Sequence, residues 1–263
     1  MTRLTQLSFL LIALTAVDAQ AAAILLDAPG DSYTGANGVV FFVPSPGIGS
    51  ISSGTNNFLT LRDTNDAGDV EAGFNTSADP QTYAGSTNGP QDVVTGGTDD
   101  LLTADIPTFT GSGAILANGV EYLEIALSIQ EPGAGSIEIL ELDVGSHSGN
   151  GLANFDSQAG TITDIGPLAG DTLTVGDVNA GTNGDLLIYI PKSLVTGVNF
   201  LLYAALDNTG GGNENFAART GDPFANMQPL LVPEPSSLAL VALLGGLPLI
   251  RRRRQKKMTQ PAA

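Results

Sequence analysis

The chain has no cysteine, and this absence excludes several kinds of structure and chemistry. Disulfides, thiolate metal sites and cysteine nucleophiles are impossible, so a hydrophobic core has to stabilise the fold. There is no tryptophan, and His147 is the only histidine. A Ser-His-Asp triad would need His147, but "GSHSG" places that histidine where a G-x-S-x-G motif has its nucleophile. We therefore interpret His147 as an exposed loop residue and predict that the protein is not an enzyme.

Positive charge is nearly absent from the central part of the chain. Between Ile24 and Val232 there are three cations and 25 acids (27 in the chain, less Asp18 and Glu234), so this body carries 3 − 25 = −22. Such a body repels nucleic-acid phosphates, which excludes a nucleic-acid partner, and it attracts divalent cations. Six of the ten lysines and arginines follow residue 250. An asymmetry of this kind indicates processing or a membrane signal.

The N-terminal segment, residues 1–23, has the three-part layout of a secretory signal peptide. Arg3 gives a positive start, Leu7 to Val17 are mostly apolar, and small residues follow. Two cleavage motifs are present, Ala19-Gln20-Ala21 and Ala21-Ala22-Ala23. The sequence thus predicts export through the cytoplasmic membrane, with the cut after Ala21 or after Ala23.

The C-terminal segment predicts a short membrane helix followed by a basic cluster. Ser236 to Ile250 contain no charge, and as a helix they would be about 22 Å long, against ~30 Å of hydrocarbon. Such a helix fits if flanking arginines snorkel and the bilayer thins. The cluster contains Arg251, Arg252, Arg253, Arg254, Lys256 and Lys257. By the positive-inside rule it stays cytoplasmic and the body faces outward.

The stretch "VPEPSSLALVALLGGLPLIRRRRQKK" resembles the PEP-CTERM sorting signal of bacterial exported proteins. The resemblance implies that Pro233, Glu234 and Pro235 are recognised by exosortase, a membrane protease-transpeptidase, and that Arg251 to Arg254 act as the stop. It also implies removal of the tail and a host that makes extracellular polysaccharide and biofilm. Two prolines around Glu234 favour an extended segment, which a protease cleft accepts. We assign 221–232 as a linker, 233–257 as the sorting signal and 258–263 as a tail.

The body, residues 24–220, alternates short apolar runs with clusters of Gly, Pro, Asn and Asp, which is typical of strands and turns. Outside one helical turn at "PKSLVTG" no segment of the body has helical periodicity, so we predict an all-β fold, a jelly-roll-like β-sandwich. The connection Asn75–Asp105 is expected to be a loop. The ten predicted strands are Ile24–Asp27, Val39–Val43, Asn57–Arg62, Val70–Phe74, Ile106–Thr110, Val120–Gln130, Ser136–Val144, Thr161–Ile165, Asp185–Ile190 and Val198–Leu206.

Three of these strands carry finer predictions. Val120–Gln130 alternates strictly, which predicts one buried face, with Leu123 and Ile125 on it, and one polar face. In Ser136–Val144 the apolar phase changes between Ile139 and Leu140, so either a β-bulge or burial on both faces is required. Val198–Leu206 is apolar almost throughout and predicts a central strand.

Two acidic segments are candidates for a calcium site, because both resemble the start of D-x-[DN]-x-[DN]-G. Neither has the ligands that an EF-hand needs at positions five and twelve, and acidic turns explain the same residues. No cofactor is expected, with calcium as the open alternative. The candidate ligands are Asp63, Asn65, Asp69, Asp177, Asn179 and Asp185.

Together these features predict a structural or adhesive protein of the cell surface or extracellular matrix. It is anchored transiently in the membrane, processed by exosortase and in contact with extracellular polysaccharide. One alternative is a carbohydrate-binding module of the biofilm matrix, with or without calcium. Another is a secreted glycoside hydrolase, which needs only two carboxylates facing each other across a cleft.

Overall fold

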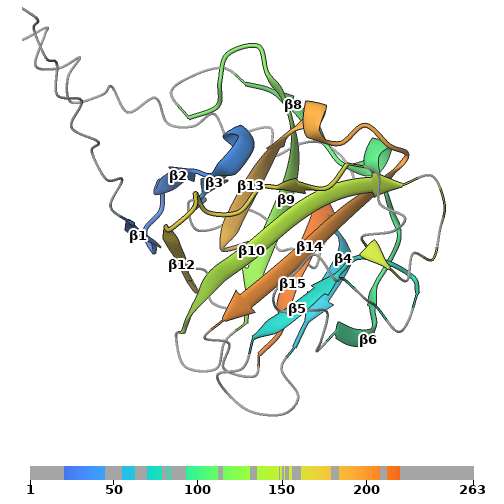
Figure 1. Ribbon diagram of the computed structural model, residues 1–263. Helices are drawn as coiled ribbons and strands as arrows, with labels where there is room; N and C mark the ends of the chain where they lie inside the picture. Colours follow the sequence, from blue (N-terminus) through green and yellow to red (C-terminus); the bar gives the residue numbers. More distant parts are fainter. Residues whose placement is uncertain are drawn as a thin grey trace, which may run out of the picture.

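The structure is a computed structural model that describes residues 21–44, 55–62, 70–78, 81, 83, 93–111, 115–130, 135–147, 149, 151, 154–155, 161–178, 184–207 and 212–219. Within these ranges the chain forms two β-sheets (Figure 1). The all-β prediction is therefore confirmed. Both predicted terminal helices lie outside the described residues. Among those that are described, no helical segment is long and apolar enough to cross a membrane.

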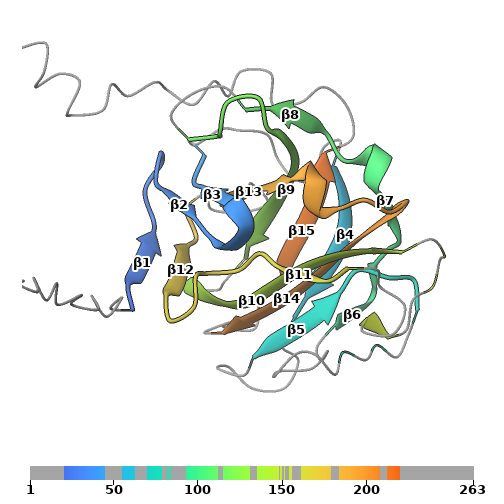
Figure 2. The same ribbon diagram turned by 45° about the horizontal axis from the view of Figure 1, so that its top comes forward.

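One sheet has seven strands, and its longest strand lies at its centre. The order along the sheet is β1-β12-β10-β14-β5, with β11 on β10 and β7 on β14. β1 runs parallel to β12 at one edge (Figure 2), and the other pairs are antiparallel. Its strands are β1 (Ala23–Leu26), β5 (Glu71–Phe74), β7 (Leu101–Leu102), β10 (Ser136–His147), β11 (Thr163–Asp164), β12 (Thr172–Gly176) and β14 (Asn199–Asp207).

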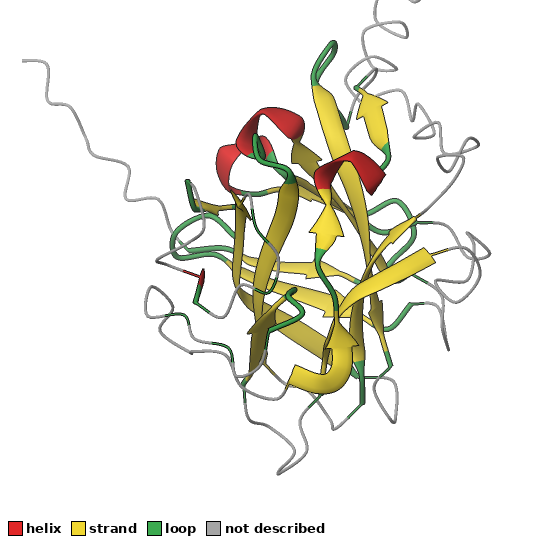
Figure 3. Cartoon of the chain, turned by 90° about the vertical axis from the view of Figure 1, so that its right-hand side faces the viewer, coloured by secondary structure: helices red, strands yellow, loops and turns green. Residues whose placement is uncertain are grey.

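The second sheet has eight strands in the order β2-β3-β13-β9-β15-β4-β6, with β8 on β9. Its strands are β2 (Ser32–Thr34), β3 (Val40–Phe42), β4 (Thr55–Leu61), β6 (Val93–Thr98), β8 (Thr108–Thr110), β9 (Glu121–Ile129), β13 (Leu186–Pro191) and β15 (Glu214–Arg219). Helix in the described part of the chain is limited to short turns (Figure 3). The three 3-10 turns are Ala36–Gly38, Thr103–Asp105 and Lys192–Leu194, and the last of them matches the turn predicted at "PKSLVTG".

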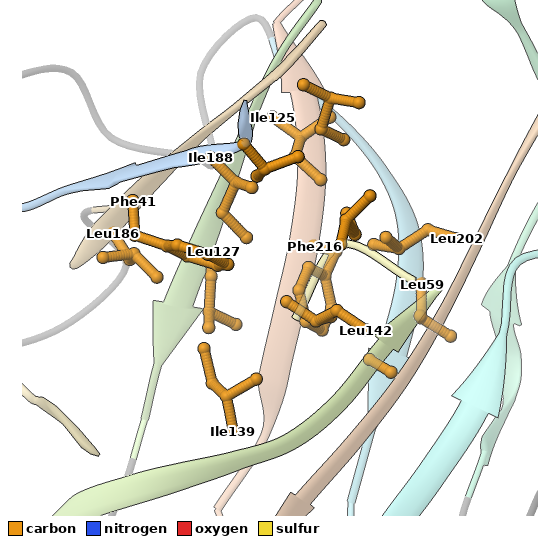
Figure 4. Close-up of a cluster of buried hydrophobic side chains, with 14 of the residues drawn as sticks. Phe41, Leu59, Ile125, Leu127, Ile139, Leu142, Leu186, Ile188, Leu202 and Phe216 are labelled. Carbon is orange, nitrogen blue, oxygen red and sulfur yellow. The ribbon is translucent and has the colours of Figure 1, made fainter. Parts of the chain in front are cut away.

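Side chains of both sheets form the main buried cluster. Ile139 and Leu142 of β10 belong to it together with Leu127 of β9 and Ile188 of β13 (Figure 4). Burial of apolar area at about 25 cal/mol per Å² is the main term that stabilises such a fold. This is the core that a chain without disulfides requires.

β9 is buried on both faces, so the prediction of one polar face was wrong. Leu123 and Ile125 lie in the main core as expected, but Tyr122 and Glu124 of the other face are only 3% and 2% exposed. A second apolar cluster covers that face, and it includes Tyr122 and Tyr189 packed against Phe109 of β8. Burial raises the pKa of Tyr189. The Glu124 carboxyl, which hydrogen bonds to Tyr189, raises it further. Alternation in one strand does not reveal which segments pack on its outer face.

β10 contains a bulge, which is one of the two arrangements that its sequence allowed. The register with β14 shifts between Ile139 and Glu141, at the point where the apolar phase changes. Ile139 and Leu142 are 1% and 0% exposed, whereas Leu140 is 36% exposed. The extra residue thus returns the apolar side chains after the bulge to the core. β14, predicted to be central, lies between β10 and β5 as expected.

Five strands were not predicted: β2, β6, β7, β12 and β15. β6 reads "VVTGGT" and contains two glycines, and β15 reads "ENFAAR" and contains two alanines. Both residue types are unfavourable in strands. β15 nevertheless forms because β9 and β4 both pair with it. The expectation of a loop over Asn75–Asp105 was wrong in part, since β6, β7 and the turn Thr103–Asp105 lie within it.

Candidate functional site

Most residues that the sequence singles out lie outside the described ranges. This holds for the sorting motif Pro233 to Pro235, for the basic cluster Arg251 to Arg254, and for four of the calcium candidates. Those four are Asp63, Asn65, Asp69 and Asn179. The remaining two candidates, Asp177 and Asp185, are described, and the fold places both at the same end of the body.

Four pairs of consecutive strands, each pair divided between the two sheets, have adjacent ends at this end of the body, which we call the acidic end. Glu214 pairs with both Leu61 and Ile129, and Ser136 pairs with Gly176. The pairings thus bring the last residues of β4, β9, β12 and β14 and the first residues of β5, β10, β13 and β15 together. The two candidate segments, 63–69 and 177–185, follow β4 and β12 in the sequence, two strands that end here. The sequence did not predict that strands over 100 positions apart would end at the same end of the body.

Asp185 ties the end of β9 to the residues that follow β12. Its side chain is fully buried, and its Oδ2 accepts a hydrogen bond of 2.8 Å from the Ile129 amide, while its Oδ1 accepts one of 3.1 Å from the Val178 amide. The Asp177 amide donates to the Gly135 carbonyl oxygen at 3.1 Å. A buried carboxylate needs such partners, so Asp185 has a structural role. Its role as a calcium ligand stays a prediction.

The described part of the body has little positive charge to balance its acids. Lys192 Nζ lies 3.5 Å from Glu121 Oε2 in an ion pair whose two side chains are exposed. No group of three or more His, Asp or Glu side chains in that part is arranged to hold a metal ion. Lys192 lies just after the end of β13, away from the acidic end.

His147 lies at the opposite end of β10 and is only 8% exposed, so the expectation of an exposed loop residue was wrong. Its Nδ1 accepts a hydrogen bond of 3.2 Å from the Gly149 amide. Burial lowers the pKa of His147, and the nearby Asp100 carboxylate opposes this effect. No local pattern indicated this burial, because "GSHSGNG" is typical of a turn.

A serine, a histidine and an aspartate meet here, but their order is not that of a catalytic triad. The Ser77 hydroxyl donates to Asp100 Oδ2 at 2.6 Å. A hydroxyl has one proton to donate, so Ser77 has none to give to His147, the base that a triad requires. Asp100 also accepts a hydrogen bond of 3.1 Å from the Gly151 amide. The arrangement therefore joins the segments around 77, 100 and 151 to one another.

A second group of carboxyls lies on the outer face of β10, where sequence reasoning did not place a site. Glu141 and Asp143 are two residues apart in a strand, so they point the same way, and their side chains hydrogen bond to each other. The Tyr83 hydroxyl donates a hydrogen bond to Asp143 Oδ2. Burial raises the pKa of Asp143, as does Asp164, whereas the bonds from Tyr83 and Glu141 lower it. The spacing "ELD" in a predicted strand could have revealed this pair.

Aromatic rings close the space above Asp143. The Tyr83 ring centroid lies 4.6 Å from those of Phe155 and Tyr203, and Phe155 and Tyr203 are fully buried. A glycosidase needs its two carboxyls ~5–10 Å apart across a cleft, with sugar or water between them. Two carboxyls that hydrogen bond to each other do not provide that geometry. Asp143 is buried and Glu141 is half-buried, and Asp143 holds Tyr83 against the sheet.

Comparison of the chain with protein-family models, with curated proteins and with solved structures found no match. The interpretation of the body therefore depends on its own residues and geometry.

Proposed function

We propose that this protein is an exported structural or adhesive component of the cell surface or extracellular matrix. The observation that carries the proposal is the direction of the chain at both ends of the body. β1 begins at Ala23 and runs toward the acidic end, and β15 starts at the acidic end and runs away from it to Arg219. Both described ends of the chain thus lead away from the acidic end. They lead to the two segments whose sequences are typical of export and sorting signals.

The proposed route uses both segments. The N-terminal signal peptide directs export, and the helix at Ser236–Ile250 anchors the precursor with Arg251 to Arg254 on the cytoplasmic side. Exosortase then cuts at Pro233-Glu234-Pro235 and releases the body or transfers it to the surface. The described polar side chains are consistent with a structural role for the body, because Asp100, Asp143 and Asp185 all bond to neighbouring segments.

We also propose that the body is a β-sandwich of the jelly-roll type. The support is a common core contributed by both sheets. In addition, the chain changes sheet at every step from β12 through β13 and β14 to β15, which is how jelly rolls connect their layers.

The sorting step is tested by replacing the motif's only charged residue. In a host with exosortase, the wild-type protein is expected to lose the tail after the motif, so that its intact mass lacks the arginine cluster. Glu234→Ala is expected to retain the tail and stay in the membrane fraction. Asp222→Ala is the matched control, since it removes an acid upstream of the motif, and it should be processed normally. Normal processing of Glu234→Ala would contradict the exosortase assignment.

A carbohydrate-binding function, assisted by calcium, is the second candidate. The observation that favours it is that Asp177 and Asp185 lie at the acidic end, where β4, the strand that precedes the other candidate segment in the sequence, also ends. The test measures binding of the purified, processed protein to the host's matrix polysaccharide, with calcium and with a chelator. Its result distinguishes the carbohydrate-binding function from the structural role. Saturable binding that requires calcium favours the binding module. Matrix association that does not depend on calcium favours the structural role.

A further inference from the structure

Asp171 is held in one orientation beside the first described residues of the chain. It ends a tight turn, Leu168 to Asp171, which is closed by a hydrogen bond of 2.8 Å from the Asp171 amide to the Leu168 carbonyl. Gly170 has φ +91°, a conformation in which glycine is strongly preferred. The Tyr33 hydroxyl donates to Asp171 Oδ2 at 2.9 Å and accepts from the Leu168 amide at 2.8 Å. One carboxylate oxygen is thereby fixed by the fold.

The other oxygen of Asp171 accepts from the chain's N-terminal region. The Ala22 backbone nitrogen lies 3.0 Å from Asp171 Oδ1, and the Ala22 carbonyl accepts from the Thr172 amide at 2.9 Å. Ala23 then begins β1 in register with Thr172. Ala21, Ala22 and Ala23 are all exposed. The fold thus uses backbone atoms of Ala22 and Ala23, which the sequence alone assigned to the signal peptide.

We propose that Asp171 binds the new amino group that forms when the signal peptide is cut between Ala21 and Ala22. The inference depends on the proposed export of the protein and selects one of the two cleavage motifs, Ala19-Gln20-Ala21. Hydrolysis adds water across the Ala21–Ala22 amide: the leader leaves with a carboxylate on Ala21, and Ala22 keeps the nitrogen. That nitrogen takes up a proton at neutral pH.

Cleavage turns a hydrogen bond with one charged partner into an ion pair without moving the chain. In the precursor the neutral Ala22 amide donates to the Asp171 carboxylate. In the processed protein an ammonium group stands at the same place, 3.0 Å from a carboxylate oxygen, so both partners are charged and Coulomb attraction adds to the hydrogen bond. Among the described ionisable groups, Asp171 bonds to this nitrogen and Tyr33 bonds to Asp171. A cut after Ala23 would instead remove Ala22 with both of its hydrogen bonds and the first residue of β1.

The first test determines the N-terminus of the exported protein. The full chain is expressed with its own leader in a bacterium, and the product outside the cytoplasm is analysed by intact mass and N-terminal sequencing. Ala22 as the first residue is the expected result. Ile24, or any other first residue, would overturn this inference and leave export intact. An uncut leader would overturn both the inference and the proposed export.

The second test measures the pKa of that amino group in the processed protein. The chain has three lysines, Lys192, Lys256 and Lys257, so NMR of ¹³C-methylated amines resolves the terminal group. An adjacent carboxylate favours the charged form, so the pKa should lie above that of an ordinary chain terminus and fall in Asp171→Asn. Asp105→Asn, which removes an exposed acid of the turn Thr103–Asp105, should leave it unchanged.

A wild-type measurement keeps the inference testable if Asp171→Asn does not fold. Salt at about 1 M shortens the Debye length to ~3 Å, so the pKa of the terminal amino group should move toward its ordinary value. The same pKa in low and high salt, or in wild type and Asp171→Asn, would show that no ion pair forms.

Discussion

At the scale of single residues, the buried acids of this body stabilise it by bonding rather than by charge. Asp185 accepts two backbone hydrogen bonds, and Asp143 lies beneath Tyr83 beside Glu141. Burying a carboxylate is costly unless it is hydrogen bonded or neutral. Asp143 meets this requirement through partners and through a raised pKa.

The raised pKa of Asp143 predicts a pH effect on stability. A carboxyl whose pKa is higher in the folded state than in the unfolded state stabilises the fold in its protonated form. This contribution is fully present below the unfolded-state pKa and is lost as the pH rises through the folded-state pKa. We therefore expect Asp143→Asn, which stays neutral, to gain stability relative to wild type as the pH rises above about 4. Urea unfolding at several pH values measures this difference, with the exposed Asp105→Asn as control. A difference that does not change with pH would contradict the prediction.

At the scale of elements, the bulge in β10 decides which side chains reach the core. Leu142 is fully buried and Leu140 is 36% exposed, although only two positions separate these two leucines. We expect Leu142→Ala to lower the free energy of unfolding by about 2–5 kcal/mol, because it opens a cavity in the core. Leu140→Ala, the matched control, should change it by roughly 0.5 kcal/mol or less. Equal losses in urea unfolding would show that the bulge is misplaced.

At the scale of the whole molecule, the direction of the chain predicts how the precursor is oriented. Both described ends of the chain lead away from the acidic end, so the segment proposed to anchor the precursor continues from the opposite end of the body. We therefore expect the acidic end to point away from the membrane, where polysaccharide or cations reach it first.

Single cysteines can test this orientation, because the chain has none of its own. Ser136 is an exposed residue at the acidic end, and Ser193 is an exposed residue in the turn after β13, away from it. A fluorophore on Ser193→Cys should be quenched by headgroup-bound nitroxides more strongly than one on Ser136→Cys. Equal quenching in the anchored precursor, or the reverse order, would contradict the expected orientation.

The sequence by itself determined the class of fold, most of the strands and the expected topology of the two ends. Alternation of side chains is a local property, so it revealed the buried Leu123 face of β9 and the bulge after Ile139. The proposed sorting signal is likewise a linear motif, so its identification rests on the sequence alone. The absence of cysteine and the single histidine restricted the chemistry without any structural information.

Tertiary structure alone decided what covers each sheet and which distant residues meet. It buried Glu124 and His147, brought the 177–185 segment and the end of β4 to one end of the body, and set Ala22 beside Asp171. β15 became a strand because two neighbours supply its hydrogen bonds, not because its residues favour one. These outcomes depend on contacts between residues far apart in the chain, and a local pattern carries no information about such contacts.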